Sequence, residues 1–516
     1  MKRKFSLVVL LLVLAVSAVL GNTAHGEPRY GGLLKATINS NPASLDPIFE
    51  TGESELIPAS HIFETALATG LEGDIYDCVC TYEQKNDGMI LELTLRDGVE
   101  FHDGSAVTIE DLKASADRWL ANVSFAKSHV GSKLESLEVE GSKLIFTFKD
   151  PAPLALIAIS AWSRGLYIFP RWLCEKYPDS KIENSDLTGT GPYMFREYQA
   201  GRFVVLEKFK GYVPRESGGT GLAKAKQGYL DTIYFYPVSD KTARITGVQT
   251  GEYDVGIGVP FNMMETLKKD ERLTVEVKEL GIMPVVVFNF RQGPCSDVNL
   301  RNAILACLDM NELMMAAQGD RSLFYLNPSF MQKSSRWWTE ESLGKYNAVD
   351  LEKAREYLAA SSYDGSPLVF ITTKANDYFY KTALVIQQMV KPIGIEIDLQ
   401  VYDNPTLRQY RNQPDKFDMF SGGITAKVDP SLIAFMPEGW AGFYSSEKKS
   451  HYYGILTSES DFDRRYEAWV EMTRVLYEEL PAITFGERNV AVVSRSYVKD
   501  LFDTTEKYYW NTWISK

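Results

Sequence analysis

Histidine and carboxylate side chains are the groups in this sequence that would carry acid–base or metal chemistry. Beyond residue 26 the histidines are His61, His102, His129 and His451, and no two have the His-Glu-x-x-His spacing of a helix-borne metal pair. The 68 aspartates and glutamates are too many to identify a glycosidase-like pair, and no Gly-x-Ser-x-Gly segment marks a nucleophilic serine. The sequence therefore predicts no catalytic residue, no metal ligand, no cofactor and no enzyme.

Strand patterns are clearest in the first third of the chain. Leu91, Leu93 and Leu95 alternate with polar residues, which is the two-residue period of a half-buried strand. A hairpin is expected around Gly141-Ser142, because the apolar residues on its two sides would share one face of a sheet.

Helix and strand patterns alternate in the second half of the chain. Asp297 is a plausible N-cap for a helix over 300–308, and Asp240 for a helix that runs to Gly251. A helical stripe over 379–390 is followed by a proline, a glycine and an alternating segment over 395–401. Helix, tight turn and strand in this order are typical of an α/β layer, so we expect an α/β fold.

The N-terminal segment has the features of a secretory signal peptide. Lys2, Arg3 and Lys4 precede an apolar run over 5–20, and small residues reach Gly26. A transmembrane anchor needs roughly 20 apolar residues, and this run is shorter. We expect cleavage after Gly26 and, because no cysteine precedes Cys78, no lipid anchor. The mature chain is expected to be soluble in the periplasm.

Charge and cysteine content exclude two classes of protein. The formal net charge of −13 argues against a nucleic-acid partner. Five cysteines in 516 residues are too few for a disulfide scaffold, so we expect local pairing at most, and burial of any free thiol. The sequence does not predict the pairing among Cys78, Cys80, Cys174, Cys295 and Cys307.

Several short motifs occur in an order that spans nearly the whole chain. They are Ser44-Leu45-Asp46-Pro47, the segment Leu95 to Gly104 with Phe101-His102-Asp103-Gly104 at its end, Thr188 to Tyr193, Thr250 to Asp254, Phe288-Asn289, Leu300 to Ile304, and Ile393-Gly394-Ile395. In sequence and order they resemble the motifs of family 5 extracellular solute-binding proteins, which include dipeptide, oligopeptide and nickel-complex receptors.

The resemblance implies a periplasmic binding protein-like class II fold, with two α/β lobes around a ligand cleft and an inserted, smaller β-rich domain. The expected parts are lobe I (27–60, 186–285 and 485–516), domain II (61–185) and lobe III (286–484), after a signal peptide over 1–26. Closure about hinges would enclose a solute, and a monomeric receptor would deliver it to the permease subunits of an ABC-type importer.

The resemblance also implies a set of ligand-binding positions. From lobe I these are Glu50, Thr51, Gly52, Gly258 and Val259. From lobe III they are Tyr378 and the segment Gly422, Gly423, Ile424 and Thr425. Most of the motif residues have a structural interpretation instead: His102 is expected to hydrogen-bond backbone, and Asp429 to form a turn before Pro430.

The sequence departs from the peptide receptors at Ala426. Receptors that hold a peptide α-amine place an aspartate there, and this chain has alanine beside Lys427. A buried ammonium group without a carboxylate partner is costly, so the ordinary dipeptide mode is not expected unless Glu50 or Glu53 substitutes.

Aromatic and basic residues near this segment have two interpretations each. Trp440, Phe443 and Tyr444 would either stack on a ligand or pack in a core. Arg411 would either meet an anionic group bidentately or form a surface salt bridge. The ligand stays open between a dipeptide, an oligopeptide, an oligosaccharide, an opine-like compound and a metal chelate. The alternatives to a transport receptor are a secreted hydrolase of glycosidase type and a sensory or chaperone-like protein on the same scaffold.

Overall fold

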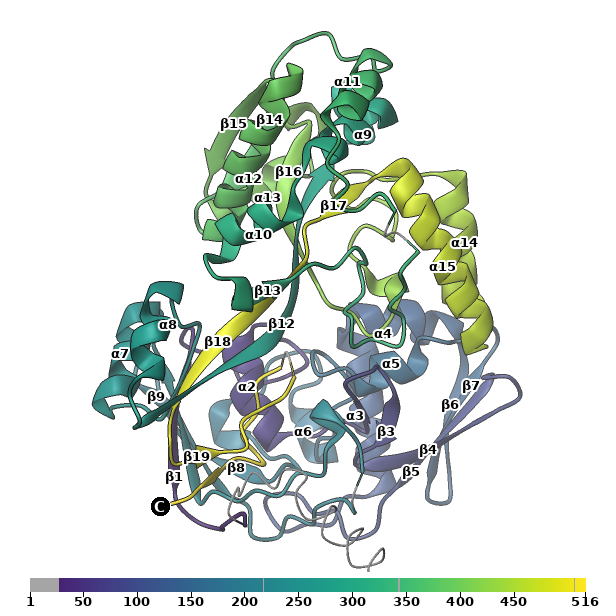
Figure 1. Ribbon diagram of the computed structural model, residues 1–516. Coiled ribbons are helices and arrows are strands. Elements are labelled where there is room, and N and C mark those ends of the chain that lie inside the picture. Colours follow the sequence, from purple (N-terminus) through teal and green to yellow (C-terminus); the bar gives the residue numbers. More distant parts are fainter. Residues whose placement is uncertain (1–26, 217, 342–343, 505) are drawn as a thin grey trace, which may run out of the picture.

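The computed structural model describes residues 27–216, 218–341, 344–504 and 506–516 (Figure 1). The predicted signal peptide over 1–26 lies outside the described residues. In the described ranges, no helix combines the length and the apolar character that crossing a membrane requires.

One large mixed sheet runs through both lobes. Its strands are hydrogen-bonded in the order β15-β14-β16-β12-β18-β11-β1-β10-β9-β8, with β13 paired to β18 and β17 to β12. The bounds are β1 Leu33–Ile38, β8 Tyr193–Gln199, β9 Phe203–Lys208, β10 Thr232–Pro237, β11 Val255–Ile257, β12 Leu273–Phe288, β13 Phe324–Tyr325, β14 Leu368–Thr373, β15 Ile397–Tyr402, β16 Met419–Thr425, β17 Ala482–Thr484 and β18 Glu487–Arg495. A short pair, β19 (Val498–Lys499) and β20 (Trp513–Ile514), lies near the C-terminus.

Lobe I is built on the parallel strands β1, β10 and β11. The helices of this lobe are α2 (Glu53–Ile62), α7 (Lys241–Thr250) and α8 (Phe261–Lys268). Asp240 caps α7 by accepting a hydrogen bond from the Ala243 amide, and Gly251 ends the helix in the left-handed conformation, with a φ of 86°. The helix predicted between Asp240 and Gly251 is confirmed.

Domain II carries a separate antiparallel sheet in the order β4-β5-β7-β6. The predicted strand and hairpin are confirmed as β5 and as β6 with β7. The elements of this domain are β2 Leu67–Thr69, β3 Ile75–Asp77, β4 Cys80–Lys85, β5 Ile90–Leu95, α3 Ile109–Asn122, α4 Ser124–His129, β6 Leu134–Glu140, β7 Lys143–Phe148, α5 Ala155–Ser160 and α6 Arg171–Lys176. One cluster of buried apolar side chains continues from lobe I into domain II, so the two parts share a core.

Lobe III has a parallel arrangement of β14, β15 and β16. Buried side chains form one core on each face of this part of the sheet. The helices are α9 Val298–Cys307, α10 Met310–Gln318, α11 Leu351–Ala359, α12 Asp377–Val390, α13 Asn404–Tyr410, α14 Glu447–Ser458 and α15 Phe462–Glu479. Asp297 caps α9 as predicted, by accepting a hydrogen bond from the Asn299 amide.

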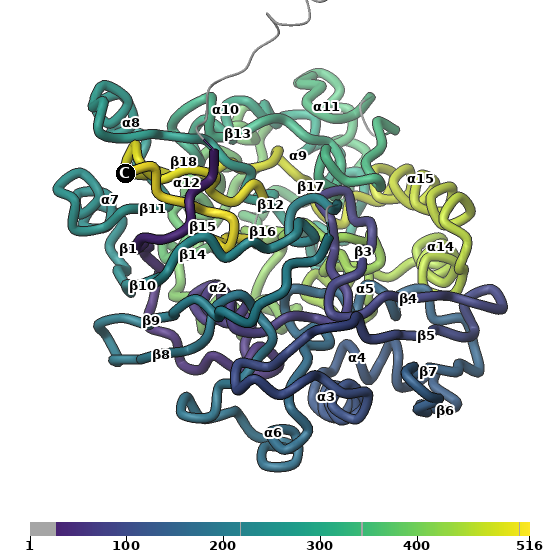
Figure 2. Tube along the Cα trace, turned by 90° about the horizontal axis from the view of Figure 1, so that it is seen from below, coloured from purple at the N-terminus to yellow at the C-terminus, as the bar shows by residue number. Residues whose placement is uncertain are grey.

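Lobe III also rests on domain II. Figures 1 and 2 both show α14 and α15 beside the sheet of domain II. Lys133 donates from Nζ to the Thr457 carbonyl oxygen at 3.0 Å, and Arg336 forms an ion pair with Asp74 at 2.9 Å. These contacts join the two parts at a distance from the shared strands.

Two strands, β12 and β18, belong to both lobes (Figure 1). β12 pairs with β18 from Leu273 to Glu279, and with β16 from Ile282 to Phe288. The register of the β12–β18 pair shifts between Glu279 and Ile282, where Gly281 has a φ of 62°. An irregularity of this kind bends a strand, and the name hinge is used below for this bend at Gly281 between the lobes.

The five cysteines all lie in the described ranges, and each is buried with a free thiol. The expected burial of unpaired cysteines as small apolar side chains is confirmed.

Candidate functional site

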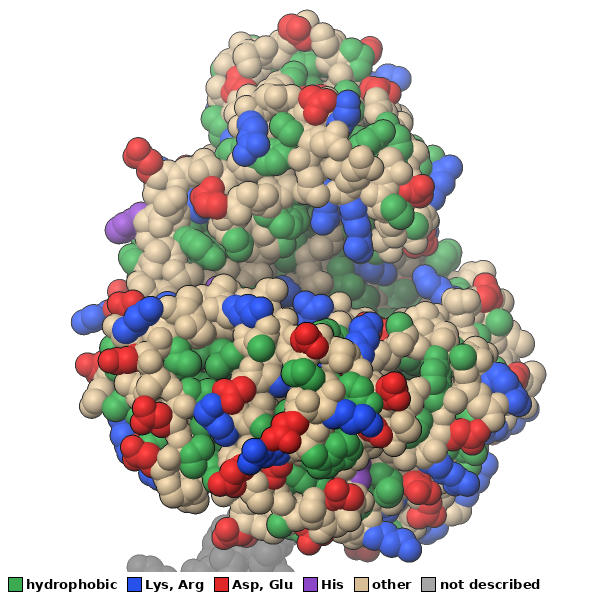
Figure 3. Space-filling model, turned by 180° about the vertical axis from the view of Figure 1, so that it is seen from behind, with side chains coloured by type: hydrophobic (Ala, Val, Ile, Leu, Met, Phe, Trp, Pro, Cys, Tyr) green, Lys and Arg blue, Asp and Glu red, His purple; other side chains and the backbone are tan. Residues whose placement is uncertain are grey.

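The parallel strands of both lobes end at the hinge. Ile257, the last residue of β11, pairs with Val492 toward the hinge end of β18. Thr425, the last residue of β16, lies opposite Ile282 of β12. The carboxyl ends of the strands therefore face each other across the hinge, which is where open α/β sheets bind ligands. Figure 3 shows a hollow between the upper and lower parts of the molecule, with lysine and arginine side chains around it.

Arg244 of α7 lies where the carboxyl ends of β1, β10 and β11 come together. Its Nη1 donates hydrogen bonds to Asn39 Oδ1 at 2.6 Å and to the Val238 carbonyl oxygen at 2.8 Å. A Cβ atom built on Gly258 would lie 3.6 Å from Nη2 of the same guanidinium group. The residue is 3% exposed, and burial lowers the pKa of Arg244. One buried cation thus touches all three strand ends.

Asn39, Val238 and Gly258, which follow β1, β10 and β11, are called the wall of lobe I below. The start of α2 adjoins this wall. Ser40 is exposed and follows Asn39, and its amide and hydroxyl groups both lie 3.0 Å from Ser54 Oγ in the first turn of α2. Thr51 and Gly52, predicted as ligand-binding, are exposed immediately before that turn. The Ser40–Ser54 contacts therefore join the start of α2 to the segment that begins with Asn39, the hydrogen-bond partner of Arg244.

Two carboxylates near α2 already have cationic partners. Glu50 forms an ion pair with Lys181 at 2.5 Å, and Glu53 accepts a hydrogen bond from the buried ammonium group of Lys507. Each carboxylate therefore already has a cationic partner, which argues against its replacing the aspartate that is missing at Ala426.

Gly258 and Val259 contribute backbone to the wall of lobe I. Both amides lie 3.0 Å from the Ala491 carbonyl oxygen of β18. Gly258 has a φ of 83°, which glycine adopts without strain, while the Val259 side chain packs in the core beneath α8.

On lobe III, Tyr378 and Gly423 lie together near the hinge. A Cβ atom on Gly423 would lie 2.9 Å from Tyr378 Oη. The Arg488 guanidinium carbon lies 3.9 Å from the centre of the Tyr378 ring, which is a cation–π geometry. Burial lowers the pKa of Arg488, and the nearby phenol of Tyr378 opposes that shift. Thr425, on the same face of β16, is exposed.

Gly422 and Ile424 point to the opposite face of β16. A Cβ atom on Gly422 would meet Val285 at 3.2 Å, and Ile424 is buried in the second core of lobe III. Alternate residues of a strand face opposite sides, so only Gly423 and Thr425 of the predicted segment face the hinge.

The segment after β16 approaches lobe I. The Ala426 amide donates a hydrogen bond of 2.6 Å to the carbonyl oxygen of Gly281. Lys427 is partly buried; burial lowers the pKa of Lys427, and the carboxylate of Glu506 in lobe I opposes that shift. Asp429 accepts a hydrogen bond from the Ser431 amide and forms a buried ion pair with Arg465 at 2.5 Å, which confirms its expected turn role.

Arg411, Trp440 and Phe443 form a separate group. The Arg411 guanidinium carbon lies 5.7 Å from the Trp440 ring centre, and Phe443 stacks with Phe417 at 6.3 Å. Trp440 contacts Phe420, which lies roughly 17 Å along the strand from Thr425 at about 3.4 Å per residue. Arg411 Nε has no hydrogen-bond partner in the described part of the chain.

Tyr444 lies in the core of lobe III. It is 4% exposed, packs against Phe290 and Phe435, and donates a hydrogen bond to Glu479 at 2.7 Å. Of the two interpretations of Tyr444, stacking on a ligand or packing in a core, the structure supports packing in the core.

The partly buried His102 and the buried His61 are both hydrogen-bonded to backbone. His102 Nε2 lies 2.9 Å from the Gly191 carbonyl oxygen, and its Nδ1 accepts from the Gly189 amide at 3.3 Å. The expected backbone contact of His102 is confirmed, although its partners belong to a distant motif. His61 likewise lies between the Ile57 carbonyl oxygen and the Tyr509 amide. In the described ranges, no group of three His, Cys, Asp or Glu side chains is arranged to hold a metal ion.

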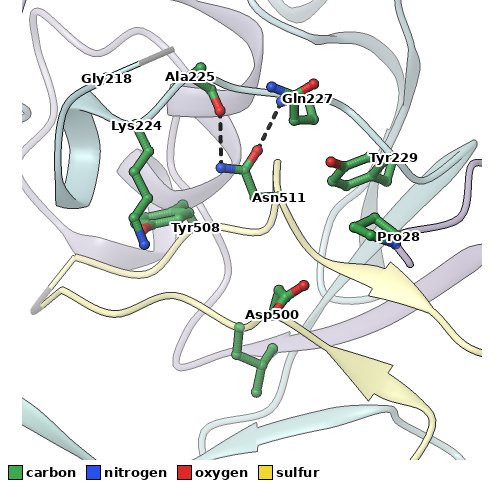
Figure 4. Close-up of a pocket in the computed structure, with 10 residues that line it drawn as sticks. Pro28, Gly218, Lys224, Ala225, Gln227, Tyr229, Asp500, Tyr508 and Asn511 are labelled. Carbon is green, nitrogen blue, oxygen red and sulfur yellow. Dashed lines mark hydrogen bonds between the residues drawn. The ribbon is translucent and has the colours of Figure 1, made fainter. Parts of the chain in front are cut away.

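A cavity of about 440 Å³ lies elsewhere on lobe I (Figure 4). Asn511 crosses it, accepting from the Gln227 amide at 2.9 Å and donating to the Ala225 carbonyl oxygen at 3.1 Å. Lys224 and Tyr508 both bond Asp503. None of the predicted ligand-binding residues lines this cavity.

Sequence reasoning missed Arg244 and Arg488. Arg244 had a detectable signal, because it stands beside Ile245 and four residues before Val248 on the buried face of a predicted helix. Arg488 had none, because its proximity to Tyr378 depends on how distant segments pair.

Comparison with known proteins identifies a family that this chain matches. Residues 63–442 match the family model described as bacterial extracellular solute-binding proteins, family 5 Middle. A probable peptide ABC transporter periplasmic-binding protein of Sinorhizobium fredii is 24% identical, over 91% of each chain. The glutathione-binding protein GsiB of Salmonella typhi is 24% identical, over 86% of this chain and 87% of its own.

Solved structures show the same architecture. The ABC transporter substrate binding protein CtaP of Listeria monocytogenes matches with a TM-score of 0.81 at 18% identity, over 95% of this chain and 100% of that chain. The predicted class, a periplasmic binding protein-like class II fold, is confirmed by this likeness.

Proposed function

The chain belongs to family 5 of the bacterial extracellular solute-binding proteins, and on that premise we propose that it captures a small organic solute between lobe I and lobe III for delivery to the permease subunits of an ABC-type importer. The observation that carries this proposal is the meeting of the strand ends of both lobes across the hinge at Gly281. The hollow in Figure 3 lies between the same two parts.

Closure about Gly281 would enclose the solute. The lobes share β12 and β18, so a change of bend at the irregular step between Glu279 and Ile282 moves one lobe relative to the other. A solute that contacts both walls stabilises the closed form, which a permease can distinguish from the empty form. No chemical change of the solute is needed.

An ordinary dipeptide is not the proposed solute. Ala426 provides no carboxylate for an α-amine, and Glu50 and Glu53 are already bound by Lys181 and Lys507. The printed names of the relatives describe one protein for peptides and one for glutathione. A peptide-like or related solute that does not depend on a buried ammonium group fits this wall.

The proposal includes the place and form of action. The receptor would be released into the periplasm by cleavage after Gly26, carry no lipid anchor, act as a monomer and catalyse no reaction. Among the predicted binding positions it retains Thr51, Gly52, Gly258, Tyr378, Gly423 and Thr425, which lie near the hinge or on the wall of lobe I.

Native mass spectrometry of the protein purified without denaturation tests the proposal. A stoichiometric small molecule that is released intact, and that raises the unfolding temperature when returned, is the expected result. Reproducible turnover of a substrate panel would instead establish the hydrolase alternative. An importer operon beside the gene would argue against a sensory role.

A further inference from the structure

Four arginines in the described ranges are buried, and they differ in how their guanidinium groups are satisfied. Arg118 and Arg465 each form an ion pair with a buried aspartate. Arg301 donates hydrogen bonds from Nε, Nη1 and Nη2 to backbone carbonyl oxygens. Arg244 forms no ion pair with any carboxylate of the described residues, and only its Nη1 donates hydrogen bonds.

The free edge of Arg244 has a defined direction. Because Nη1 is fixed by Asn39 Oδ1 and the Val238 carbonyl oxygen, the unused donors are Nε and Nη2. Nη2 lies beside Gly258, which has no side chain to cover it. Nε and Nη2 lie along one side of a planar guanidinium group, and this pair of donors matches the two oxygens of a carboxylate.

The positive charge of Arg244 is not balanced by a carboxylate of the described residues in contact with it. Asp240, which caps the same helix, is exposed and acts on Arg244 only through space. A buried cation without a paired anion is unfavourable, which makes Arg244 a candidate for binding an anionic group from outside the chain. The lysine and arginine side chains around the hollow in Figure 3 add a positive field in a protein of net charge −13.

We infer that Arg244 is the anchor of lobe I for a carboxylate group of the transported solute, received between Asn39 and Gly258 at the ends of β1 and β11. The inference rests on the proposed receptor function and deepens it by naming the chemical class of the solute, an organic carboxylate. Asn39 and Val238 position the guanidinium group, and Gly258 leaves the approach open.

The first test uses the wild-type protein and a chemically modified solute mixture. The protein is unfolded, dialysed, refolded and incubated with yeast extract, or with the same extract after methyl esterification of its carboxylates. Native mass spectrometry then records the retained solutes. Retention from untreated extract but not from esterified extract is expected.

The outcomes separate the two proposals. Equal retention from both extracts would overturn the carboxylate inference and leave the receptor function standing. Retention from neither extract would overturn the receptor function, and the inference with it.

The second test uses Arg244→Gln. For a solute retained from untreated extract, the affinity of the variant should fall by about 30-fold or more, since a desolvated charge partner is lost. Arg196→Gln is the matched control, because Arg196 is an exposed arginine of β8. An unchanged affinity in Arg244→Gln, in a protein that still unfolds cooperatively, would overturn the inference. If the variant does not fold, the esterified extract decides.

Discussion

Arg118 donates a hydrogen bond of 2.6 Å from Nη2 to Asp46 Oδ2, and both side chains are buried. Asp46 belongs to the Ser-Leu-Asp-Pro motif of lobe I, and Arg118 to α3 of domain II. The same carboxylate oxygen accepts a hydrogen bond from the Ile182 amide at 3.1 Å. One aspartate thus fastens the inserted domain to the lobe that carries it.

Asp46→Asn should therefore destabilise the protein strongly. Removing one charge of a buried pair leaves the other uncompensated, and we expect a loss of about 3–5 kcal/mol in the free energy of unfolding. Chemical denaturation measures it. Asp117→Asn is the control, because it breaks the exposed pair with Lys113 and should cost about 0.5 kcal/mol or less. Equal effects of the two substitutions would contradict the role given to Asp46.

The buried His61 and the partly buried His102 should make the protein sensitive to mild acid. Burial lowers the pKa of His61 to about 3 and that of His102 to about 4, against about 6.5 in an unfolded chain. Well above pH 6.5, from about pH 7.5, both are neutral in either state and add no pH dependence. Below pH 6.5 the unfolded chain binds protons that the folded chain does not, so the free energy of unfolding falls by up to about 1.4 kcal/mol per pH unit for each histidine.

Urea unfolding of His102→Asn between pH 7 and pH 4.5 checks this. The slope of stability against pH should be shallower than that of the wild type by about one proton. His451→Gln is the control, because it removes an exposed histidine. A His102→Asn slope identical to wild type would show that His102 binds its proton equally in both states.

Ala426→Asp should weaken solute binding. A carboxylate beside Lys427 would neutralise part of the positive field near the hinge and repel a carboxylate solute, for which we expect at least about a tenfold loss of affinity. Isothermal titration with the solute identified from yeast extract measures it. Ala426→Asn has nearly the same size without the charge, and an equal loss in that variant would assign the effect to crowding instead.

Gly423 and Tyr378 should show coupled effects on stability. A Cβ atom at position 423 would lie 2.9 Å from Tyr378 Oη and 3.3 Å from Ile282, so Gly423→Ala should cost about 1–2 kcal/mol through overpacking. Tyr378→Phe removes that oxygen and should recover part of the loss in the double variant. Gly454→Ala, where nothing lies within 4 Å, is the control and should not destabilise. Additive effects of the two substitutions would contradict the contact.

A bulky residue at Gly423 bears on binding as well as on stability. Gly423→Leu should abolish the thermal stabilisation by the yeast-extract solute, since it fills the hinge face of β16. Circular dichroism checks that the variant is folded, and an unchanged stabilisation would remove Gly423 from the site.

The motifs predicted the fold well because they hold the scaffold together. His102 bonds the Gly189 and Gly191 motif, and Asp254 accepts from the Lys35 amide at 2.7 Å and from the Tyr497 hydroxyl at 2.6 Å. Such contacts recur wherever the same layers are assembled. They carry no information about the solute, which explains why the family resemblance did not identify one.

The site was less predictable because it depends on register and on side-chain partners. Gly422 and Gly423 are neighbours in sequence, yet they face opposite sides of β16. Glu50 resembles a free carboxylate in the sequence, and only the fold brings Lys181 to it. Arg244 differs from the other three buried arginines of the described ranges because it has neither an ion pair nor hydrogen bonds from all of its nitrogen atoms, which no pattern of residues reveals.

The strands shared by the lobes also affect how the protein melts. Since β12 is hydrogen-bonded to β18 in lobe I and to β16 and β17 in lobe III, loss of either half of the sheet exposes the backbone of the other. The two lobes are therefore expected to unfold together and not one after the other. Heating should give a single cooperative transition, and a solute that touches only the hinge should protect residues at both ends of the molecule from hydrogen exchange.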